Sequence, residues 1–369
     1  MKKILLCGLI LFQVQAFACD DQIKPFARDC AIQDRYVALK NAFAAKQINI
    51  DEIAEYRVIR FVDRYNWERA KTSKVKPDFI YEPAPATWAV WDSGIREVMK
   101  VGGTKGRLDN GFDLDENSIS FVNKNLLMNE EQHLNVKDKI TDQSLVPGEY
   151  RRVTSTGVGF SSNGKDYTSM ISASEESMNR FQARWESMMG ASFEELLRQS
   201  NVSNYSGANL RSGMTETPAK NFVLYAPSTA VPTALAWIKN FVRLNLDRYK
   251  AGRPTLAPME LAAVTQKWLV SIHPFSDGNG RTSRAVQDLI LVNFEMPFVP
   301  GGDLQEDATA IYEDYIERTY SKTESQLAAL ELCLTVNAPA FHCQTVEQLN
   351  TLAVPTAGQK EFRKAVKKD

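Results

Sequence analysis

The sequence contains little histidine and no excess of positive charge. Its three histidines, His133, His273 and His342, are too few for a histidine-rich metal centre. Lysine and arginine total 44 against 45 aspartates and glutamates, and this balance argues against a dedicated nucleic-acid-binding protein, which usually carries a basic surface. Hydrophobic residues make up 44% of the 369 residues, so the chain can bury a core. The length allows one large domain or two modest ones.

Long hydrophobic runs are also missing after the first residues. No later run approaches the roughly 20 apolar residues that a membrane-spanning helix needs, so we expect no transmembrane segment. The N-terminus has the layout of a secretory signal peptide, with Lys2 and Lys3, an apolar stretch over residues 4–12, and Ala-Phe-Ala at residues 16–18. We therefore expect residues 1–18 to be cleaved and the mature protein to be exported, to a periplasm or out of the cell. The alternative is a buried N-terminal helix.

Cysteine use agrees with export. Four cysteines follow the expected signal peptide: Cys19, Cys30, Cys333 and Cys343. An even number in an oxidising compartment predicts disulfides. Each end of the chain carries two cysteines about ten residues apart, and short loops cost the least entropy to close, so the two local pairs are favoured. Four unpaired thiols remain an alternative, as does a lipid on Cys19.

The hydrophobic pattern has mostly helical spacing. It predicts helices over 51–71, 92–101, 117–130, 173–200, 231–250, 258–271 and 279–294, and one or two more over 305–333. Short strands are expected over 153–160 and 221–225. This pattern is typical of a mainly α fold with a few short strands.

The segment from Ser271 to Arg284 concentrates chemically useful residues. Pro274 ends one helix, and the apolar period restarts at Ala285, so a helix–loop–helix is expected. Gly278 and Gly280 allow backbone conformations that other residues avoid. The N-terminus of the second helix would offer N–H groups and a positive dipole end, which together bind phosphate.

The side chains of this loop fit chemistry on a phosphate. His273 is the one loop residue that can take up a proton near neutral pH. Asp277 is a hard oxygen ligand that suits Mg²⁺, and Arg281 and Arg284 can grip anionic oxygens with forked donors. A base, a metal ligand, an anion cradle and two arginines together indicate nucleotidyl or phosphoryl transfer.

The same segment resembles the signature of the Fic (Fido) family, His-x-Phe-x-(Asp/Glu)-Gly-Asn-Gly-Arg-x-x-Arg. Every fixed position is filled, by His273, Phe275, Asp277, Gly278, Asn279, Gly280, Arg281 and Arg284. Residues 258–263 resemble the helix that enters the motif, residues 148–151 an upstream Gly-x-Tyr-Arg element, and residues 222–227 a strand-like flap.

The resemblance implies a Fic/Fido-type helical core with a short β-hairpin flap. The helical spacing of residues 20–72, which the resemblance does not cover, predicts an N-terminal helical extension. The expected organisation is a signal peptide over 1–18, the N-terminal extension over 19–110, a catalytic domain over 111–335 with an insertion at about 160–215, and a C-terminal tail over 336–369.

The resemblance also implies an activity, which is the transfer of AMP from ATP to a Ser, Thr or Tyr hydroxyl of a target protein. His273 would be the general base, and Asp277 would hold Mg²⁺ against the phosphates. The anion hole would be formed by Gly278, Asn279 and Gly280, and the phosphates would be gripped by Arg281 and Arg284. The flap residues Val223, Leu224 and Tyr225 would hold the target backbone as an added strand.

Three questions remain open at this point. ATP is scarce outside a cell, so the donor could instead be another diphosphate that supplies a different nucleotidyl group or phosphocholine, or the domain could be a non-catalytic nucleotide- or protein-binding module. The family's usual inhibitory pattern, Ser/Thr-x-x-x-Glu-Gly/Asn, has no strict match. Two looser matches run from Thr309 to Glu313 and from Ser172 to Glu176. Inhibition could therefore be absent, or could come from an antitoxin-like partner. A homo-oligomer is also possible.

Overall fold

The structure is a computed structural model of the whole chain. It describes residues 19–60, 67–68, 71–72, 94–99, 116–127, 146–151, 156–159, 221–224, 231–301, 312–335 and 340–352. The expected signal peptide, the helix expected over 173–200, the insertion at about 160–215 and the flap residue Tyr225 lie outside the described residues.

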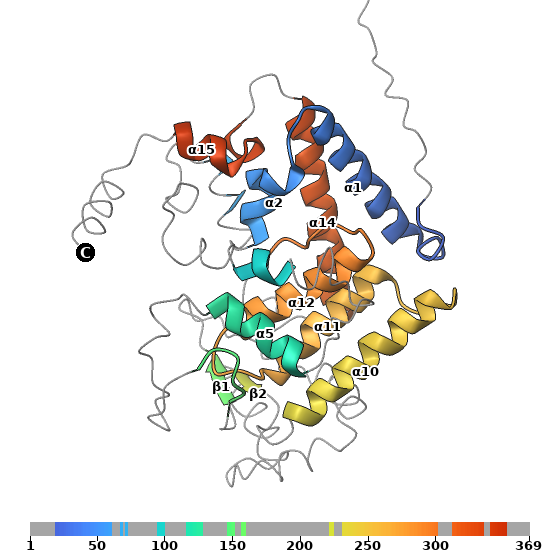
Figure 1. The fold of residues 1–369 in the computed structure, drawn as a ribbon, viewed down its shortest axis with the longest axis vertical. Coiled ribbons are helices and arrows are strands. Elements are labelled where there is room, and N and C mark those ends of the chain that lie inside the picture. Colours follow the sequence, from blue (N-terminus) through green and yellow to red (C-terminus); the bar gives the residue numbers. More distant parts are fainter. Residues whose placement is uncertain are drawn as a thin grey trace, which may run out of the picture.

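The described part of the chain is mainly α-helical, as the sequence predicts (Figure 1). The helices are α1 (Ala27–Ala45), α2 (Ala54–Arg57), α5 (Glu116–Leu127), α10 (Val231–Lys250), α11 (Pro258–Ile272), α12 (Asn279–Asn293), α14 (Tyr312–Thr335) and α15 (Val346–Leu352). Short 3₁₀ helices lie at η1 (Ile50–Glu52), η2 (Val58–Arg60) and η5 (Phe341–Cys343), and residues 94–99 are helical. The helices expected over 231–250, 258–271 and 279–294 are thus present almost to the residue.

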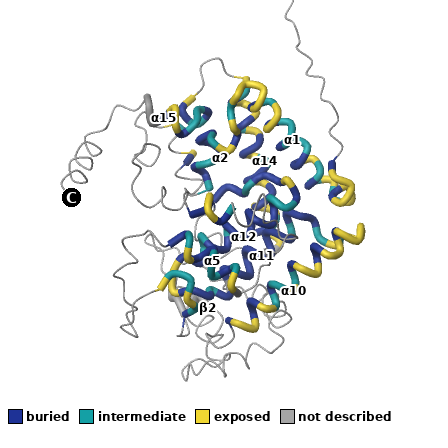
Figure 2. Tube along the Cα trace, in the orientation of Figure 1, coloured by how far each residue is buried: buried dark blue, intermediate teal, exposed yellow. Residues whose placement is uncertain are grey.

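Helices α11 and α12 form the centre of the fold. Helix α11 begins with Pro258 in its first turn, where the missing N–H costs no hydrogen bond, and its apolar residues are buried on all sides. It packs against α12, α10 and α14, while α5 covers α12 and α1 packs on α14 (Figure 1). Figure 2 shows α11 and α12 mostly buried and α10 exposed along its outer side. The loop between α11 and α12 is therefore supported from several directions.

The N-terminal helix α1 is tied to the start of α11 by a buried carboxylate. Asp29 accepts a hydrogen bond from the backbone N–H of Met259 at 2.8 Å, and its other oxygen accepts one from the hydroxyl of Tyr320. Burial raises the pKa of Asp29. Asp29 therefore caps α11 from a distant part of the chain, in the way that a local N-cap residue would.

One expected helix is broken in the structure, so the prediction of a continuous helix from residue 51 was wrong in its first part. The chain runs through η1, an extended residue at Ile53, then α2 and η2. Ile53 forms an antiparallel bridge with Thr345, and the N–H of Ala54 donates to the carbonyl of Gln344 at 2.9 Å. Pairing with the C-terminal segment thus replaces the helical hydrogen bonds at this point.

The two expected strands pair with each other. Strands β1 (Thr156–Gly159) and β2 (Asn221–Leu224) form a two-stranded antiparallel sheet, with Thr156 opposite Leu224 and Gly157 opposite Val223. Residues 222–224 of the expected flap, which include Val223 and Leu224, therefore lie in a β-strand.

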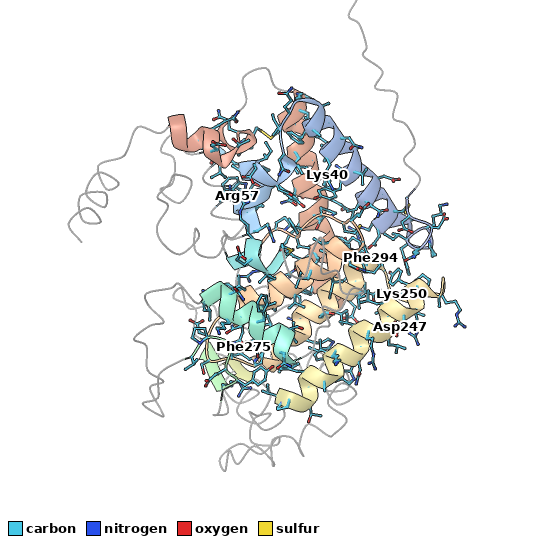
Figure 3. All side chains as sticks on the ribbon, viewed as in Figure 1. Lys40, Arg57, Asp247, Lys250, Phe275 and Phe294 are labelled. Atoms are coloured by element: carbon cyan, nitrogen blue, oxygen red, sulfur yellow. A yellow bond between two sulfur atoms is a disulfide. The ribbon has the colours of Figure 1, made fainter. Side chains whose placement is uncertain are left out.

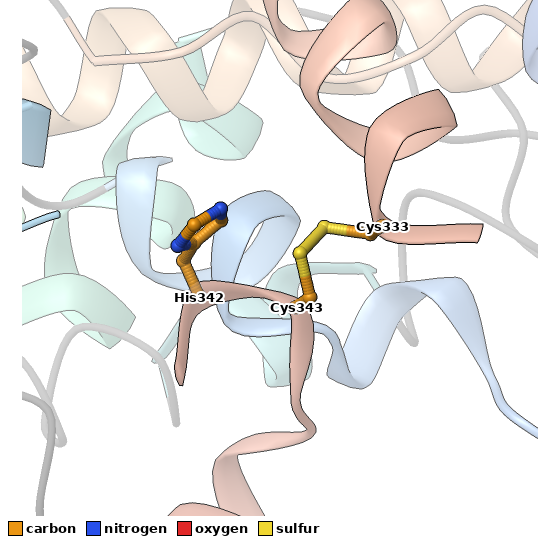
Figure 4. Close-up of side chains that lie close together, drawn as sticks. All are labelled: Cys333, His342 and Cys343. Carbon is orange, nitrogen blue, oxygen red and sulfur yellow. A yellow bond between two sulfur atoms is a disulfide. The ribbon is translucent and has the colours of Figure 1, made fainter. Parts of the chain in front are cut away.

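Both local cysteine pairs are disulfides. Cys19 is bonded to Cys30, next to the capping Asp29, and Cys333 at the end of α14 is bonded to Cys343 in η5. Figure 4 shows His342 beside the second bond. The ligand atoms of Cys333, His342 and Cys343 lie within 4.8 Å of one another, but sulfurs joined in a disulfide are not thiolate ligands, so this cluster is not a metal site in this state.

None of the helices in the described ranges has the length and apolar character that are needed to cross a membrane.

Disulfide content gives a direct test of this part of the fold. Before reduction, none of Cys19, Cys30, Cys333 and Cys343 should react with an alkylating reagent, and after reduction all four should, as read by intact-protein mass spectrometry. Replacing either pair by serine should lower the free energy of unfolding by about 2–3 kcal/mol, because each bond closes a short loop. Four reactive thiols without reductant would contradict the pairing.

Candidate active site

The motif segment forms a tight loop between α11 and α12. Helix α11 ends at Ile272, and the next residue, His273, has a left-handed backbone with φ of 50°. Helix α12 begins at Asn279 after Gly278, whose φ is 76°. Non-glycine residues rarely adopt positive φ, and such strain often occurs at functional sites. The loop therefore turns sharply and places His273 and the N-terminus of α12 at its two ends.

The side chain of Asn279 closes this loop on itself. Its Oδ1 accepts a hydrogen bond from the N–H of Phe275 at 2.9 Å, and its Nδ2 donates to the carbonyl of the same residue at 2.7 Å. Phe275, labelled in Figure 3, is buried in the main core, and Tyr150 bridges to its backbone and lies 5.4 Å from its ring, measured between centroids. The side chain of Asn279 is thus fixed by the loop backbone, and its main chain lies at the N-terminus of α12.

Arg151 holds the residues around His273. Its backbone N–H donates to the carbonyl of Pro274 at 2.9 Å, its Nε to that of His273 at 2.5 Å, and a terminal nitrogen to that of Ile272 at 3.1 Å. These carbonyls follow the end of α11, where helical partners run out. This supporting role of Arg151 was not predicted from the sequence. Its signal was the Gly-x-Tyr-Arg element at residues 148–151.

A second supporting residue, Asn123 on α5, was missed altogether. Its Nδ2 donates to the carbonyl of Asp277 at 3.1 Å and to the hydroxyl of Thr282 at 3.0 Å, while its Oδ1 accepts from the N–H of Gly148 at 2.8 Å. Asn123 is buried, and it connects the motif loop, α12 and the segment that carries Arg151. No feature of the local sequence around residue 123 marks it.

The environment of His273 keeps its imidazole neutral. Burial, followed by the positive charge of Arg151, lowers the pKa of His273 to about 3, while the backbone of Val270 acts in the opposite direction. A neutral imidazole can accept a proton, whereas an imidazolium cannot. At neutral pH His273 is therefore in the form that can accept a proton, although so low a pKa makes its imidazole a weak base.

Asp277 lies next to the N-terminus of α12 with its carboxylate accessible. Its Oδ1 accepts a hydrogen bond from the N–H of Gly278 at 2.5 Å and one from Arg281 at 3.4 Å, and its side chain is 46% exposed. Carboxylate oxygens are preferred ligands of Mg²⁺, which also keeps several waters when bound. An exposed carboxylate beside an anion site fits that ion, so Asp277 is a suitable Mg²⁺ ligand.

The residues expected to bind an anion lie in the first turns of α12. The helix N-terminus includes Asn279, Gly280 and Arg281, so its N–H groups and dipole point into the loop. Arg281 and Arg284 both line a pocket beside α12, together with Asp288 and with Arg60 from η2. The rest of the lining is apolar and comes from residues 94–99, α5 and α12. The structure thus brings the motif residues together and adds a charged pair that the sequence did not suggest.

The remaining candidate residues lie apart from this loop in the chain order. Val223 and Leu224 belong to β2 of the flap, and Glu313, one loose match to an inhibitory glutamate, is exposed in the first turn of α14. The four disulfide cysteines lie in the N- and C-terminal segments and stabilise the scaffold.

Comparison with known proteins agrees with the motif. Residues 127–291 match the Fic/DOC family, so this part of the chain is a Fic domain. A protein adenylyltransferase of Caenorhabditis elegans is 46% identical over 43 residues, which are 12% of this chain and 8% of that protein. A Fido domain-containing protein of Dictyostelium discoideum is 42% identical over 55 residues, which are 14% of this chain and 38% of that protein. The similarity therefore covers a minor part of these relatives.

Among solved structures, a Fic domain containing signaling protein from Bacteroides thetaiotaomicron aligns with a TM-score of 0.45 and 14% identity, over 82% of this chain and 95% of that one.

Gly278 gives a steric test of the loop. A Cβ at this position would lie 2.8 Å from a methyl carbon of Leu127 and 3.0 Å from Nδ2 of Asn123, and its φ is unfavourable for other residues. Gly278→Ala should lower the free energy of unfolding by about 2–4 kcal/mol. Gly252 is the matched control, because its φ is also positive, at 64°, but nothing lies within 4 Å of its Cβ position. Gly252→Ala should cost only about 1 kcal/mol. Equal losses in chemical denaturation would contradict the close packing of α5 on the loop.

The protonation of His273 is measurable by NMR. Because its pKa lies far below the usual 6.5, its ring C–H resonances should not shift between pH 8 and pH 5. The unfolded chain takes up this proton below pH 6.5 and the folded chain does not, so this group should also lower stability as the pH falls through that range. The spectrum of His273→Ala identifies the resonance. A titration centred near pH 6.5 would contradict the burial of the imidazole.

Proposed function

We propose that the protein transfers AMP from ATP to a Ser, Thr or Tyr hydroxyl of a target protein. The observation that carries this proposal is the tight loop that joins a neutral, backbone-strained His273 to the N-terminus of α12, whose first turns carry the two motif arginines. The Fic domain and the relatives named as protein adenylyltransferases support it. The match covers 165 of the 369 residues, from 127 to 291, and the flanking residues supply supports of their own.

The proposed reaction forms one bond, breaks one bond and needs one general base. The target hydroxyl oxygen forms a bond to the α-phosphorus of ATP, and the bond from that phosphorus to the oxygen bridging the β-phosphate breaks, which releases pyrophosphate. His273 accepts the hydroxyl proton. The first-turn N–H groups of α12 and the guanidinium of Arg281 stabilise the charge on the phosphates, and Arg284 holds the terminal phosphate. Mg²⁺, held by Asp277, would neutralise part of the phosphate charge.

The hydroxyl would be brought to His273 by the flap. Strands β1 and β2 form a two-stranded sheet, and an extended target segment can add to such a sheet through main-chain hydrogen bonds. Because strand addition uses main-chain hydrogen bonds, it fits a protein substrate. It also leaves the choice of target to side-chain contacts.

We further propose that the protein acts after export. The two disulfides and the signal-peptide layout of residues 1–18 support this, because disulfides persist in oxidising compartments. Either ATP is available where the protein acts, or the site uses another diphosphate donor. The lining of the pocket beside α12 has three arginines and one aspartate, and this favours an anionic terminal group over the cationic choline of CDP-choline.

The experiment for this proposal compares donors and one variant. Purified protein is incubated with Mg²⁺, an extract of candidate targets and labelled ATP, UTP, GTP or CDP-choline. Label should enter protein from ATP in the wild type and fall by about 100-fold or more in His273→Ala, because a general base contributes that much. Nucleotide binding should remain in the variant, since the arginines are intact.

His342→Ala is the control, because this histidine lies in η5 next to a disulfide and outside the motif. It should label protein as the wild type does. Full activity of His273→Ala would contradict the mechanism. If only CDP-choline labels protein, the transferred group is phosphocholine and not AMP. If nucleotide binds but no protein is labelled, the domain is a non-catalytic nucleotide-binding module.

A further inference from the structure

Arg60 belongs to the N-terminal part of the chain but lines the pocket of the motif arginines. It lies at the end of η2, outside the residues that match the Fic family, 127–291. In space it shares the pocket beside α12 with Arg281, Arg284 and Asp288. The family motif therefore does not explain why this side chain is there.

Arg60 is held firmly in this position. The carbonyl of Ile59 accepts a hydrogen bond from the N–H of Gly301 at 2.8 Å, and the hydroxyl of Tyr56 accepts one from the N–H of Phe298 at 2.9 Å. The guanidinium of Arg60 lies 3.7 Å from the centroid of the Phe298 ring. These contacts fix η2 against the segment that follows α12, and so they fix the direction of the Arg60 side chain.

The charged partner of Arg60 is Asp288 on α12. A terminal nitrogen of Arg60 lies 2.6 Å from Oδ2 of Asp288 and the Nε lies 3.2 Å from it, with the two side chains 10% and 6% exposed. Burial raises the pKa of Asp288, and the positive charge of Arg60 counteracts that rise. A carboxylate this deeply buried requires a cation to remain charged.

A second cation is close along the helix. Arg284 is four residues before Asp288 on α12, and side chains at this spacing lie on the same face of a helix. The charge of Arg284 also lowers the pKa of Asp288, as a smaller contribution than that of Arg60. Asp288 is therefore bound to one arginine of the N-terminal segment and shares the pocket with a second that belongs to the motif.

We propose that Arg60 is a positioning residue that binds the carboxylate of Asp288 and thereby keeps it from competing with the nucleotide's terminal phosphate for Arg284. This rests on the proposed function, in which Arg284 holds that phosphate. Without Arg60, Asp288 would turn to Arg284, and the nucleotide would have to displace a buried ion pair in order to bind. The N-terminal segment would then control donor affinity through one charge.

The test uses Arg60→Met, Arg60→Lys, Asp288→Asn and the double variant Arg60→Met/Asp288→Asn. The dissociation constants of ATP and of AMP are measured with Mg²⁺ by calorimetry. AMP lacks the β- and γ-phosphates, so its affinity falls only if the site as a whole is damaged. The affinity for ATP also depends on the contact between its terminal phosphate and Arg284.

Arg60→Met should weaken ATP binding by about tenfold or more, which corresponds to one partly buried ion pair, and should leave AMP binding within about threefold of the wild type. Arg60→Lys should retain most of the affinity, because its charge still meets Asp288. In the double variant, ATP affinity should return to within about threefold of that of Asp288→Asn, because the competing carboxylate is gone.

Several results would overturn the proposal. These are unchanged ATP binding in Arg60→Met, equal losses for ATP and AMP, or a double variant that stays as weak as Arg60→Met, which would mean that Arg60 meets the phosphate itself. If Arg60→Met does not fold, the ATP affinities of Asp288→Asn and of the double variant are compared. They should be equal, since Arg60 should be dispensable once residue 288 is neutral, and a weaker double variant would overturn the proposal.

Failure of the proposed function has a different signature. If the wild type binds no nucleotide, the function is refuted, and the positioning role is read from a crystal structure of Arg60→Met. The carboxylate of Asp288 should then lie within about 4 Å of the Arg284 guanidinium, the distance of an ion pair. A carboxylate that stays away from Arg284 in that variant would overturn the inference.

Discussion

The site depends on the hydrogen bonds that Arg151 donates to the backbone where α11 ends. Its side chain donates hydrogen bonds to the carbonyls of Ile272 and His273, and its backbone N–H donates one to the carbonyl of Pro274. A helix that stops in the core leaves carbonyls that need donors, and here one buried arginine supplies them. The same positive charge helps to hold the pKa of His273 low, so one residue both shapes the loop and keeps its base neutral.

The N-terminal segment supports the same two helices at two other points. Asp29 caps the start of α11, and the Arg60–Asp288 pair binds the segment to α12. The Cys19–Cys30 disulfide closes a loop directly next to Asp29. Residues 19–60 therefore support α11 and α12, although they lie outside the family match, which begins at residue 127. A conformational change in this segment would therefore be transmitted to the motif helices through Asp29 and Asp288.

The sequence predicted the parts of this structure that are encoded locally. The helices over 258–271 and 279–294 follow from apolar spacing and from Pro258 and Pro274, and the motif residues are contiguous, so they reach one loop by necessity. What it missed rests on distant pairing. The break at Ile53 requires Thr345, and the link between Arg60 and Asp288 joins residues 228 positions apart. Local periodicity carries no information on such contacts, because either partner alone is an ordinary residue.

The proposed reaction requires the N-terminus of α12 to receive the phosphates of the donor next to a neutral His273. The decisive experiment is a crystal structure of the protein with a non-hydrolysable ATP analogue and Mg²⁺. We expect phosphate oxygens on the first-turn N–H groups of α12, the terminal phosphate on Arg284, and the α-phosphate facing His273. A nucleotide bound away from this loop, or a loop that stays empty at saturating analogue, would contradict it.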